Sequence, residues 1–503
     1  MPGRSRPQTD SDASTVPAGP PLVPDAFHFG VATAGFQVEG GFNGPGEPAN
    51  NWCVWERTGR VEASGNAVGF WDDPEASLDR AASLGCTSFR LGVEWARVET
   101  EEGEADRAAL DRYRSILTGC RERGMEPLLT LHHFTHPAWL GEEFWLRPDA
   151  VEHFGRWVDV AVESFADLVG MWVTLNEINV VGLSSWLVGM FPPGRTLAFA
   201  DAWAAIDNLL AAHVRAYEAI YAARPDAKVT TNDASISVYE LDHLLIDLLL
   251  SRSMGVEPAE LDGWISERRA QHEVLVPATS ATERALRLLG RRTAPYGSGS
   301  PARMRTARRA VRAVFDSPHE RTLDALGIDY YDPVVSNHVR LPGHVTAGGR
   351  SLEPGRRLWD DVVDTAGLGR WLRLESARAP GLDLWVVENG LCNRVVHDRS
   401  YPRLDGWDRS RYLRECIGEV VDAVADGLPV RGYWHWSLVD NYEWGSYEPR
   451  FGLYGLDRNR GPHGFRWLET DAMGGDAPGA YRGAIAAARA GDRAALAGDR
   501  PGA

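Results

Sequence analysis

The chain has 503 residues, of which 44% are hydrophobic and 24% charged, a composition typical of a globular protein with a large core. Its net charge of −17 argues against nucleic acid as the main partner. We expect no membrane span, because no run of about 20 apolar residues is present. Five scattered cysteines without a CxxC motif favour reduced thiols and a cytoplasmic location.

The two ends of the chain differ from its centre. Residues 1–24 are rich in Pro, Ser and Thr, lack the apolar stretch of a signal peptide, and are predicted to be a disordered tail. Residues 476–503 are Ala-rich and predict a helix followed by a short tail. The segment between them, 25–475, is expected to form one catalytic domain.

Strand and helix patterns alternate along this central segment. The expected strands are 27–33, 87–93, 126–133, 171–177, 228–234, 323–331, 382–390 and 429–438. The expected helices are 75–84, 108–123, 151–169, 202–223, 365–378 and 409–426, with a helical insertion over 237–322, between strands five and six. Alternation of this kind implies a parallel sheet, and eight repeats favour a single closed (β/α)8 TIM barrel of the α/β class. No GxGxxG or phosphate loop follows the first strand, which weakens the dinucleotide-binding alternative.

Two of these strands end in a glutamate. WVTLNE ends at Glu177, and LDLWVVENG contains Glu388. A carboxylate at the end of a buried strand is costly unless that end opens into a site. Each glutamate alone could be an ion pair at a strand end. The two together indicate a paired-carboxylate site, in which one group donates a proton and the other attacks the substrate.

Polar or aromatic residues also occupy the ends of most other strands. In a barrel the active site lies at the carboxyl ends of the strands. Seven strands supply a candidate there: Gln37, Arg90, His133, Glu177, Tyr331, Glu388 and Trp436. The single lysine, Lys228, begins its strand and is expected at the opposite face, which disfavours a Schiff-base aldolase.

Several motifs in the same order resemble a known family. FGVATAGFQVEGG (29–41), LTLHHFTHPAWL (129–140), VVENG (386–390) and YWHWSLVDNYEW (433–444) resemble those of family 1 glycoside hydrolases, the retaining β-glucosidases and β-galactosidases. The resemblance extends from about Phe27 to Trp467. The stretch NEINVVGLSSWLVGMFPPG (176–194) is closer to the archaeal-type β-glycosidase branch.

The resemblance implies roles for individual residues. Glu177 would be the general acid/base and Glu388 the nucleophile, with Arg90 supporting Glu388. The implied substrate-binding residues are Gln37, His133, Asn176, Tyr331, Trp436, Glu443 and Trp444, and Trp359 is a weaker candidate for an aglycone platform. Retention of configuration would require carboxyl groups about 5–5.5 Å apart.

The expected substrate is a small β-glycoside with an unphosphorylated sugar, glucose first, with galactose and fucose left open. A carboxylate at Glu443 would repel a phosphate on that sugar. Two departures from the family pattern fall beside the leaving group: Ile178 replaces a proline, and Asp329 replaces an asparagine.

Two alternatives to a hydrolysing β-glucosidase remain open. One is a transglycosidase or a glycosidase that tailors a natural product, and the other is a catalytically inactive sugar-binding barrel. No cofactor or metal is expected. His132 and His133 are adjacent on a strand and point to opposite faces, so they do not readily share an ion with His136. The oligomeric state is left open.

Overall fold

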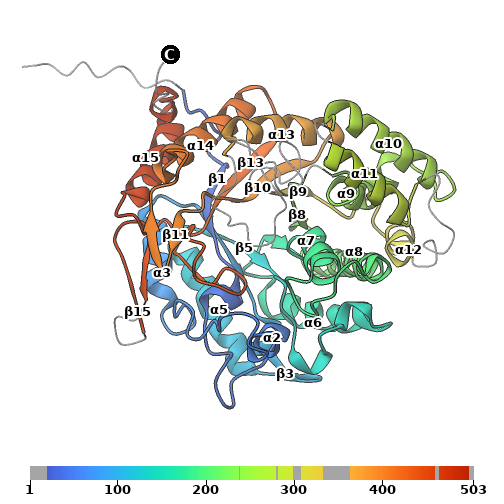
Figure 1. Cartoon of the computed structure of the whole chain (residues 1–503), viewed down its shortest axis with the longest axis horizontal. Coiled ribbons are helices and arrows are strands. Elements are labelled where there is room, and N and C mark those ends of the chain that lie inside the picture. Colours follow the sequence, from blue (N-terminus) through green and yellow to red (C-terminus); the bar gives the residue numbers. More distant parts are fainter. Residues whose placement is uncertain are drawn as a thin grey trace, which may run out of the picture.

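A nearly closed parallel barrel forms the centre of the molecule (Figure 1). The structure is a computed structural model and describes residues 20–236, 238–278, 281–297, 308–331, 363–458 and 464–497. The barrel strands are β1 (His28–Ala32), β2 (Ser88–Gly92), β5 (Glu126–Thr130), β6 (Met171–Val173), β7 (Lys228–Thr230), β8 (Asn232–Ala234), β9 (Ala325–Tyr330), β10 (Asp383–Asn389) and β13 (Val430–Trp436). The expected TIM barrel is thereby confirmed.

The fifth strand is split into two short pieces. β7 pairs with β6 and β8 pairs with β9, so the two pieces together close the barrel. The predicted continuous strand over 228–234 is wrong at Thr231, where the ladder is interrupted. Hydroxyl groups bridge this break: Thr231 Oγ1 donates to Leu175 O at 2.7 Å, and Thr230 Oγ1 donates to Ala325 O at 2.7 Å.

Helices surround the strands in Figure 1 and bury their apolar faces on them. The main helices are α3 (Pro74–Ser83), α5 (Arg107–Glu122), α6 (Ala150–Phe165), α8 (Phe199–Ala223), α13 (Thr365–Arg378) and α14 (Arg409–Ala425). Each lies within a few residues of its predicted place. Shorter helices follow individual strands: α1 (Gly35–Val38), α2 (Asn51–Arg57), α4 (Trp95–Val98) and α7 (Ile178–Gly182).

The helical insertion between the fifth and sixth strands is present as expected. It contains α9 (His243–Leu250), α10 (Leu261–Leu275), α11 (Ala281–Thr293) and α12 (Arg309–Asp316). A buried ion-pair network connects it to α13. Asp247 Oδ1 accepts from Arg268 at 2.7 Å and from Arg378 at 3.0 Å. The insertion is therefore fixed to the barrel's helical layer.

The core has two layers, one between strands and helices and one inside the barrel. β10 shows how one strand serves both. Leu384 and Val386 pack in the outer layer, whereas Trp385 and Val387 pack inside. Alternate residues of a strand face opposite sides, so a continuous apolar run is what a barrel strand requires.

The remaining elements lie outside the barrel strands. Three antiparallel pairs are formed by β3 (Glu99–Glu101) with β4 (Glu104–Ala105), β11 (Arg394–Val396) with β12 (Arg399–Tyr401), and β14 (Leu456–Arg458) with β15 (Phe465–Trp467). Helix α15 (Ala477–Ala490) reaches the barrel through Tyr481, whose hydroxyl donates to Gly30 O at 2.5 Å. No helix in the described ranges is both long and apolar enough to cross a bilayer. Residues 1–19 lie outside the described residues, and the domain limits stay a prediction.

Candidate active site

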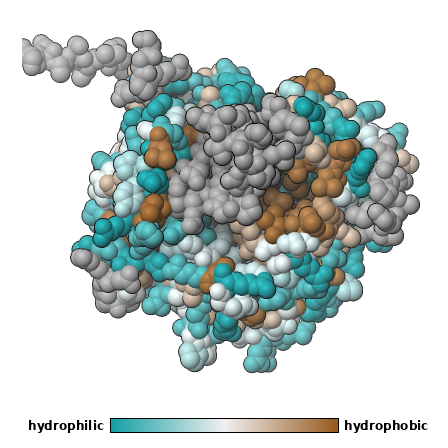
Figure 2. Space-filling view, viewed as in Figure 1, coloured by the Kyte–Doolittle hydropathy of each residue, from teal (hydrophilic) through white to brown (hydrophobic). Residues whose placement is uncertain are grey.

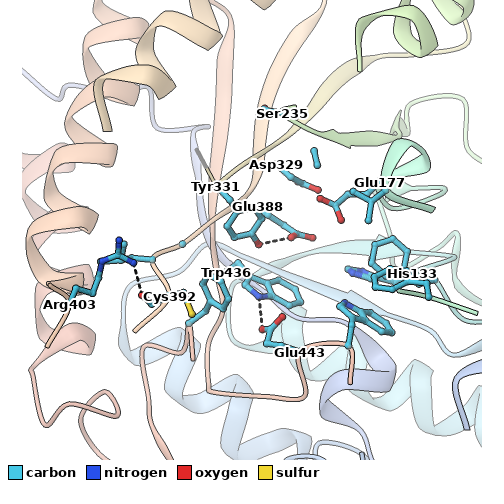
Figure 3. A pocket seen from close by; sticks show the side chains of 18 residues that line it. His133, Glu177, Ser235, Asp329, Tyr331, Glu388, Cys392, Arg403, Trp436 and Glu443 are labelled. Carbon is cyan, nitrogen blue, oxygen red and sulfur yellow. Dashed lines mark hydrogen bonds between the residues drawn. The ribbon is translucent and has the colours of Figure 1, made fainter. Parts of the chain in front are cut away.

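A pocket opens at the carboxyl ends of the barrel strands. Its cavity measures about 260 Å³. The space-filling view shows apolar residues (brown) gathered right of the centre, over the region of α7 and α8 (Figure 2). Figure 3 shows the polar side chains that converge inside. The described lining residues include His133, Glu177, Asp329, Tyr331, Glu388, Trp436, Glu443 and Trp444.

A bulge in β10 turns Glu388 into this pocket. Val387 already faces the barrel interior, so strict alternation would point the next side chain outward. The register against β9 shifts between Val386 and Glu388, however. Such a bulge re-aims the following side chain. The carbonyl that it displaces, Val387 O, accepts a hydrogen bond from Arg90 at 3.3 Å.

Two donors hold the Glu388 carboxylate. Arg90 Nη1 contacts Oε1 at 2.5 Å, and the Tyr331 hydroxyl donates to Oε2 at 2.7 Å. The Arg90 and Glu388 side chains are both buried, so each charge is compensated by the other and not by water. Asn389, the next residue, points away from the pocket and donates to Tyr330 O at 2.6 Å. The two asparagines beside the two glutamates therefore have different roles.

Glu177 is presented by an unusual backbone conformation. Its φ is +42°, in the left-handed region that favours glycine, and it directly precedes α7. Such strain persists where the surroundings impose it, and it is frequent at functional sites. The residue before it is fixed in place, because Asn176 N donates to His132 O at 2.9 Å.

The Asn176 side chain has one consistent orientation. Its Oδ1 accepts from Arg90 and from Asn232 Nδ2, the latter at 2.7 Å. Its Nδ2 therefore donates, and it lies 3.1 Å from His133 Nε2. Burial, together with Arg90, lowers the pKa of His133 well below its usual value. The imidazole is thus neutral and accepts at Nε2.

The residues expected to bind the sugar form a connected group. Trp436 Nε1 donates to Glu443 at 3.0 Å, and Gln37 Nε2 donates to the other Glu443 oxygen at 3.4 Å. The Trp444 ring is stacked on His133, with ring centroids 5.7 Å apart. Burial raises the pKa of Glu443 to about 8, which favours its protonated form at neutral pH.

Three carboxyl groups meet at the centre of the site. One oxygen from each of Glu177, Asp329 and Glu388 lies within 4.8 Å of the others. Two like charges at that distance repel by roughly 3.5 kcal/mol at an effective dielectric constant near 20. Burial and the Glu388 charge raise the pKa of Glu177 well above its usual value. The same two causes raise the pKa of Asp329.

Among the described residues, the spacing of these three carboxyl groups would also suit a metal ion. A cluster of carboxylates alone does not identify a metal site. The trio already has a cationic partner, because the Arg90 guanidinium contacts Glu388. The geometry thus favours protons and Arg90, in place of a metal, as the groups that offset the charge.

Some residues of the site were not anticipated. The fifth strand was the one without a candidate, yet its Asn232 donates to both Asn176 and Asp329. The polar residues that follow KVTT were a signal that could have indicated it. An apolar wall beside Glu177, formed by Phe134, Val180, Phe191 and Ala234, had no sequence signal of its own. The expected platform residue Trp359 lies outside the described residues.

An α/β barrel with two glutamates facing each other across a pocket defines a class of enzymes that act on glycosidic bonds. A family model described as Glycosyl hydrolase family 1 matches residues 21–266 and 302–466. The chain therefore belongs to glycosyl hydrolase family 1, as its motifs predicted. The unmatched stretch between these two ranges falls within the helical insertion.

Curated relatives are similar over most of the chain, and solved structures share its fold. A β-galactosidase of Saccharolobus solfataricus is 28% identical, with 87% of this chain and 91% of the relative covered. A 6-phospho-β-galactosidase of Staphylococcus epidermidis is 24% identical, with 86% and 94% covered. The fold matches a family 1 β-glucosidase from Thermotoga maritima with a TM-score of 0.69, 22% identity, and 93% and 98% of the two chains covered. The expected similarity to the archaeal-type branch is confirmed by the first relative.

Proposed function

We propose that the protein is a retaining β-glycosidase in which Glu388 is the nucleophile and Glu177 the general acid/base. The observation that carries this proposal is the approach of the two carboxyl groups, whose oxygens lie within 4.8 Å of each other. Retaining glycosidases bring the two groups to about 5–5.5 Å, whereas inverting ones keep about 6.5–9.5 Å for a water.

The environments of the two glutamates suit different roles. Arg90 and Tyr331 both donate to Glu388, and these two hydrogen bonds fix the direction from which its carboxylate attacks. No described cation contacts Glu177, and burial raises the pKa of its carboxyl group. Glu177 therefore starts the cycle protonated and can donate to the leaving oxygen.

The reaction then proceeds in two steps. Glu388 attacks the anomeric carbon while Glu177 protonates the departing oxygen. Esterification removes the charge on Glu388, so the pKa of Glu177 falls and Glu177 can deprotonate the incoming water. Asn176, held by Arg90 and Asn232, is positioned to bond the sugar 2-hydroxyl, a contact that strengthens in the transition state.

We propose an unphosphorylated sugar, glucose first. Arg90 is engaged by Glu388 and Arg403 by Asp405, so neither described arginine at the pocket offers its full charge to a phosphate. The expected reason for excluding a phosphorylated sugar was repulsion by the Glu443 carboxylate. The raised pKa of Glu443 weakens that reason, because it favours the neutral group at pH 7. Within the described ranges, the lack of an available cation at the pocket, more than repulsion by Glu443, disfavours a 6-phosphosugar.

The apolar wall beside Glu177 favours a hydrophobic aglycone. This supports the second candidate, a glycosidase that tailors a small hydrophobic natural product. A cytoplasmic location also stays a proposal, and the five buried cysteines without a disulfide are consistent with it.

The test uses an aryl β-glucoside and follows the first-formed product by NMR. We expect the β-anomer first, and a loss of about 10⁴-fold in kcat for Glu388→Ala, on the scale of removing a nucleophile. The α-anomer as first product would contradict retention. No turnover of any aryl β-glycoside by the wild type would support the inactive sugar-binding alternative.

A further inference from the structure

We propose that Glu177 and Asp329 form a proton-sharing pair, which acts as one acid/base unit and keeps one proton throughout the reaction. The inference rests on the proposed function, since it concerns the acid/base of that reaction.

The hydrogen bonds around Asp329 leave one of its oxygens free to carry a proton. Its side chain is 1% exposed. One oxygen, Oδ2, accepts from Asn232 Nδ2. The other, Oδ1, has no donor among the described residues.

Asn232 cannot be turned to serve that second oxygen. Its Nδ2 also donates to Asn176 Oδ1, and this atom must be an acceptor because Arg90 donates to it as well. The two hydrogens of Asn232 Nδ2 are thus both used. A proton on Asp329 therefore belongs on Oδ1.

The two carboxyl groups also approach each other closely. One carboxyl oxygen of Glu177 and one of Asp329 lie within 4.8 Å of each other. Figure 3 shows their carboxyl groups turned toward one another. Two buried carboxylates this close repel each other, so a proton on at least one of them stabilises the arrangement.

The charges around Glu177 and Asp329 also balance when the pair is protonated. The groups that act on the pair come from several elements: Glu388 on β10, Arg90 on β2, Asp233 on β8, and Tyr331 after β9. Burial raises the pKa of Asp233 well above its usual value, which favours its neutral form. Tyr331 is likewise neutral, because burial raises its pKa. The ion pair of Arg90 with Glu388 carries no net charge, and the pair of Glu177 and Asp329 is neutral when it holds two protons.

The two chemical steps preserve this balance. In the first, the bond from the anomeric carbon to the leaving oxygen breaks, that oxygen takes one proton from the pair, and Glu388 forms the ester. The pair keeps one proton and one negative charge, which now faces Arg90. In the second, the pair takes a proton from water, the water oxygen bonds to the anomeric carbon, and Glu388 leaves as carboxylate.

The test compares wild type with Asp329→Asn, which keeps the size and a donor but cannot ionise. In wild type, Glu177 stays partly protonated until the pair loses its second proton. In the variant a single ionisation removes the acid, so the alkaline limb of kcat/KM moves to lower pH. We expect this shift of the alkaline limb with phenyl β-glucoside, because its leaving oxygen must be protonated. At pH 8, the loss of kcat/KM in Asp329→Asn should be at least about tenfold larger for phenyl β-glucoside than for 2,4-dinitrophenyl β-glucoside. The second substrate has a leaving group that departs without protonation.

A buried aspartate outside the pocket supplies the matched control. Asp207 is 2% exposed and accepts from Tyr296 at 2.9 Å. Asp207→Asn should lower stability without changing the ratio between the two substrates. An Asp329→Asn profile that coincides with that of wild type, or equal losses for both substrates at every pH, would overturn the pair.

A second measurement does not depend on the variant folding. With a 2-deoxy-2-fluoroglucosyl group trapped on Glu388, difference infrared spectroscopy of the trapped against the free wild type should show a shifted band from the one carboxyl of the pair that keeps its proton. Absence of that band with Glu388 labelled would refute the pair alone. Failure to label Glu388 would refute the proposed function itself.

Discussion

At the scale of single residues, the site depends on where buried charges are compensated. Glu388 has Arg90 and Tyr331, whereas Glu177, Asp329 and Glu443 have no comparable described cation within contact. Carboxyl groups of the second kind stay protonated, and each adds a dependence of stability on pH.

Glu443→Gln tests this dependence directly. The pKa of Glu443 is raised to about 8 in the folded protein, against 4.5 as its usual value. The folded state thus binds more protons between these limits, and stability falls as pH rises through them. We expect the free energy of unfolding of the variant, which cannot ionise, to exceed that of wild type at pH 9 by up to roughly 4–5 kcal/mol. At pH 5 the two should agree, as urea denaturation would measure.

The matched control for this variant is Glu469→Gln, whose side chain is 84% exposed. It should leave the difference between pH 5 and pH 9 unchanged. If the free energy of unfolding depended on pH equally in wild type and Glu443→Gln, the pKa of the Glu443 carboxyl would not be raised by folding.

At the scale of elements, the strand ends determine which groups meet. The order of strands and the glutamates that end two of them were predictable, because buried strands read as apolar runs that stop at polar residues. The bulge before Glu388 was not, because nothing in VVENG distinguishes a bulged strand from a regular one. The break at Thr231 was missed for a similar reason, since threonine suits a continuous strand. The contact of Asp329 with Glu177 also depends on a register that only the folded barrel defines.

Gly390 fixes the end of β10 against β13. A Cβ at this position would lie 2.1 Å from Trp436 O, so any larger residue forces the two strand ends apart. We expect Gly390→Ala to cost about 1–3 kcal/mol of stability and to lower kcat by displacing Glu388. Denaturation and aryl glucoside kinetics would measure the two effects.

Gly263 in α10 provides the control. A Cβ there meets nothing within 4 Å. Alanine should therefore stabilise the helix, by about 0.5–1 kcal/mol, with kinetics unchanged. If Gly390→Ala had the same stability and activity as wild type, the close approach of Gly390 to Trp436 O would not constrain the strand ends.

At the scale of the whole molecule, buried histidines and buried carboxyl groups act in opposite directions on stability. Burial lowers the pKa of His132 to about 3 and of His213 to about 4, so stability decreases as pH falls below 6.5. Burial raises the pKa of Glu94 to about 8, so stability decreases as pH rises above about 4.5.

These opposed effects place maximum stability in mildly acid solution, between about pH 5 and 6.5. We expect the melting temperature to fall by several degrees from pH 6 to pH 9, as differential scanning calorimetry would record. A melting temperature that is constant or rising over that interval would contradict the assignment of protonated carboxyl groups to the interior.

The central claim is that Glu388 forms the covalent intermediate. Incubation with 2-deoxy-2-fluoro-β-glucosyl fluoride, followed by proteolysis and mass spectrometry, tests it most directly. The account predicts one equivalent of fluoroglucosyl label, attached to Glu388 and absent in Glu388→Gln. Label on any other residue, or full turnover with no trapped intermediate, would contradict it.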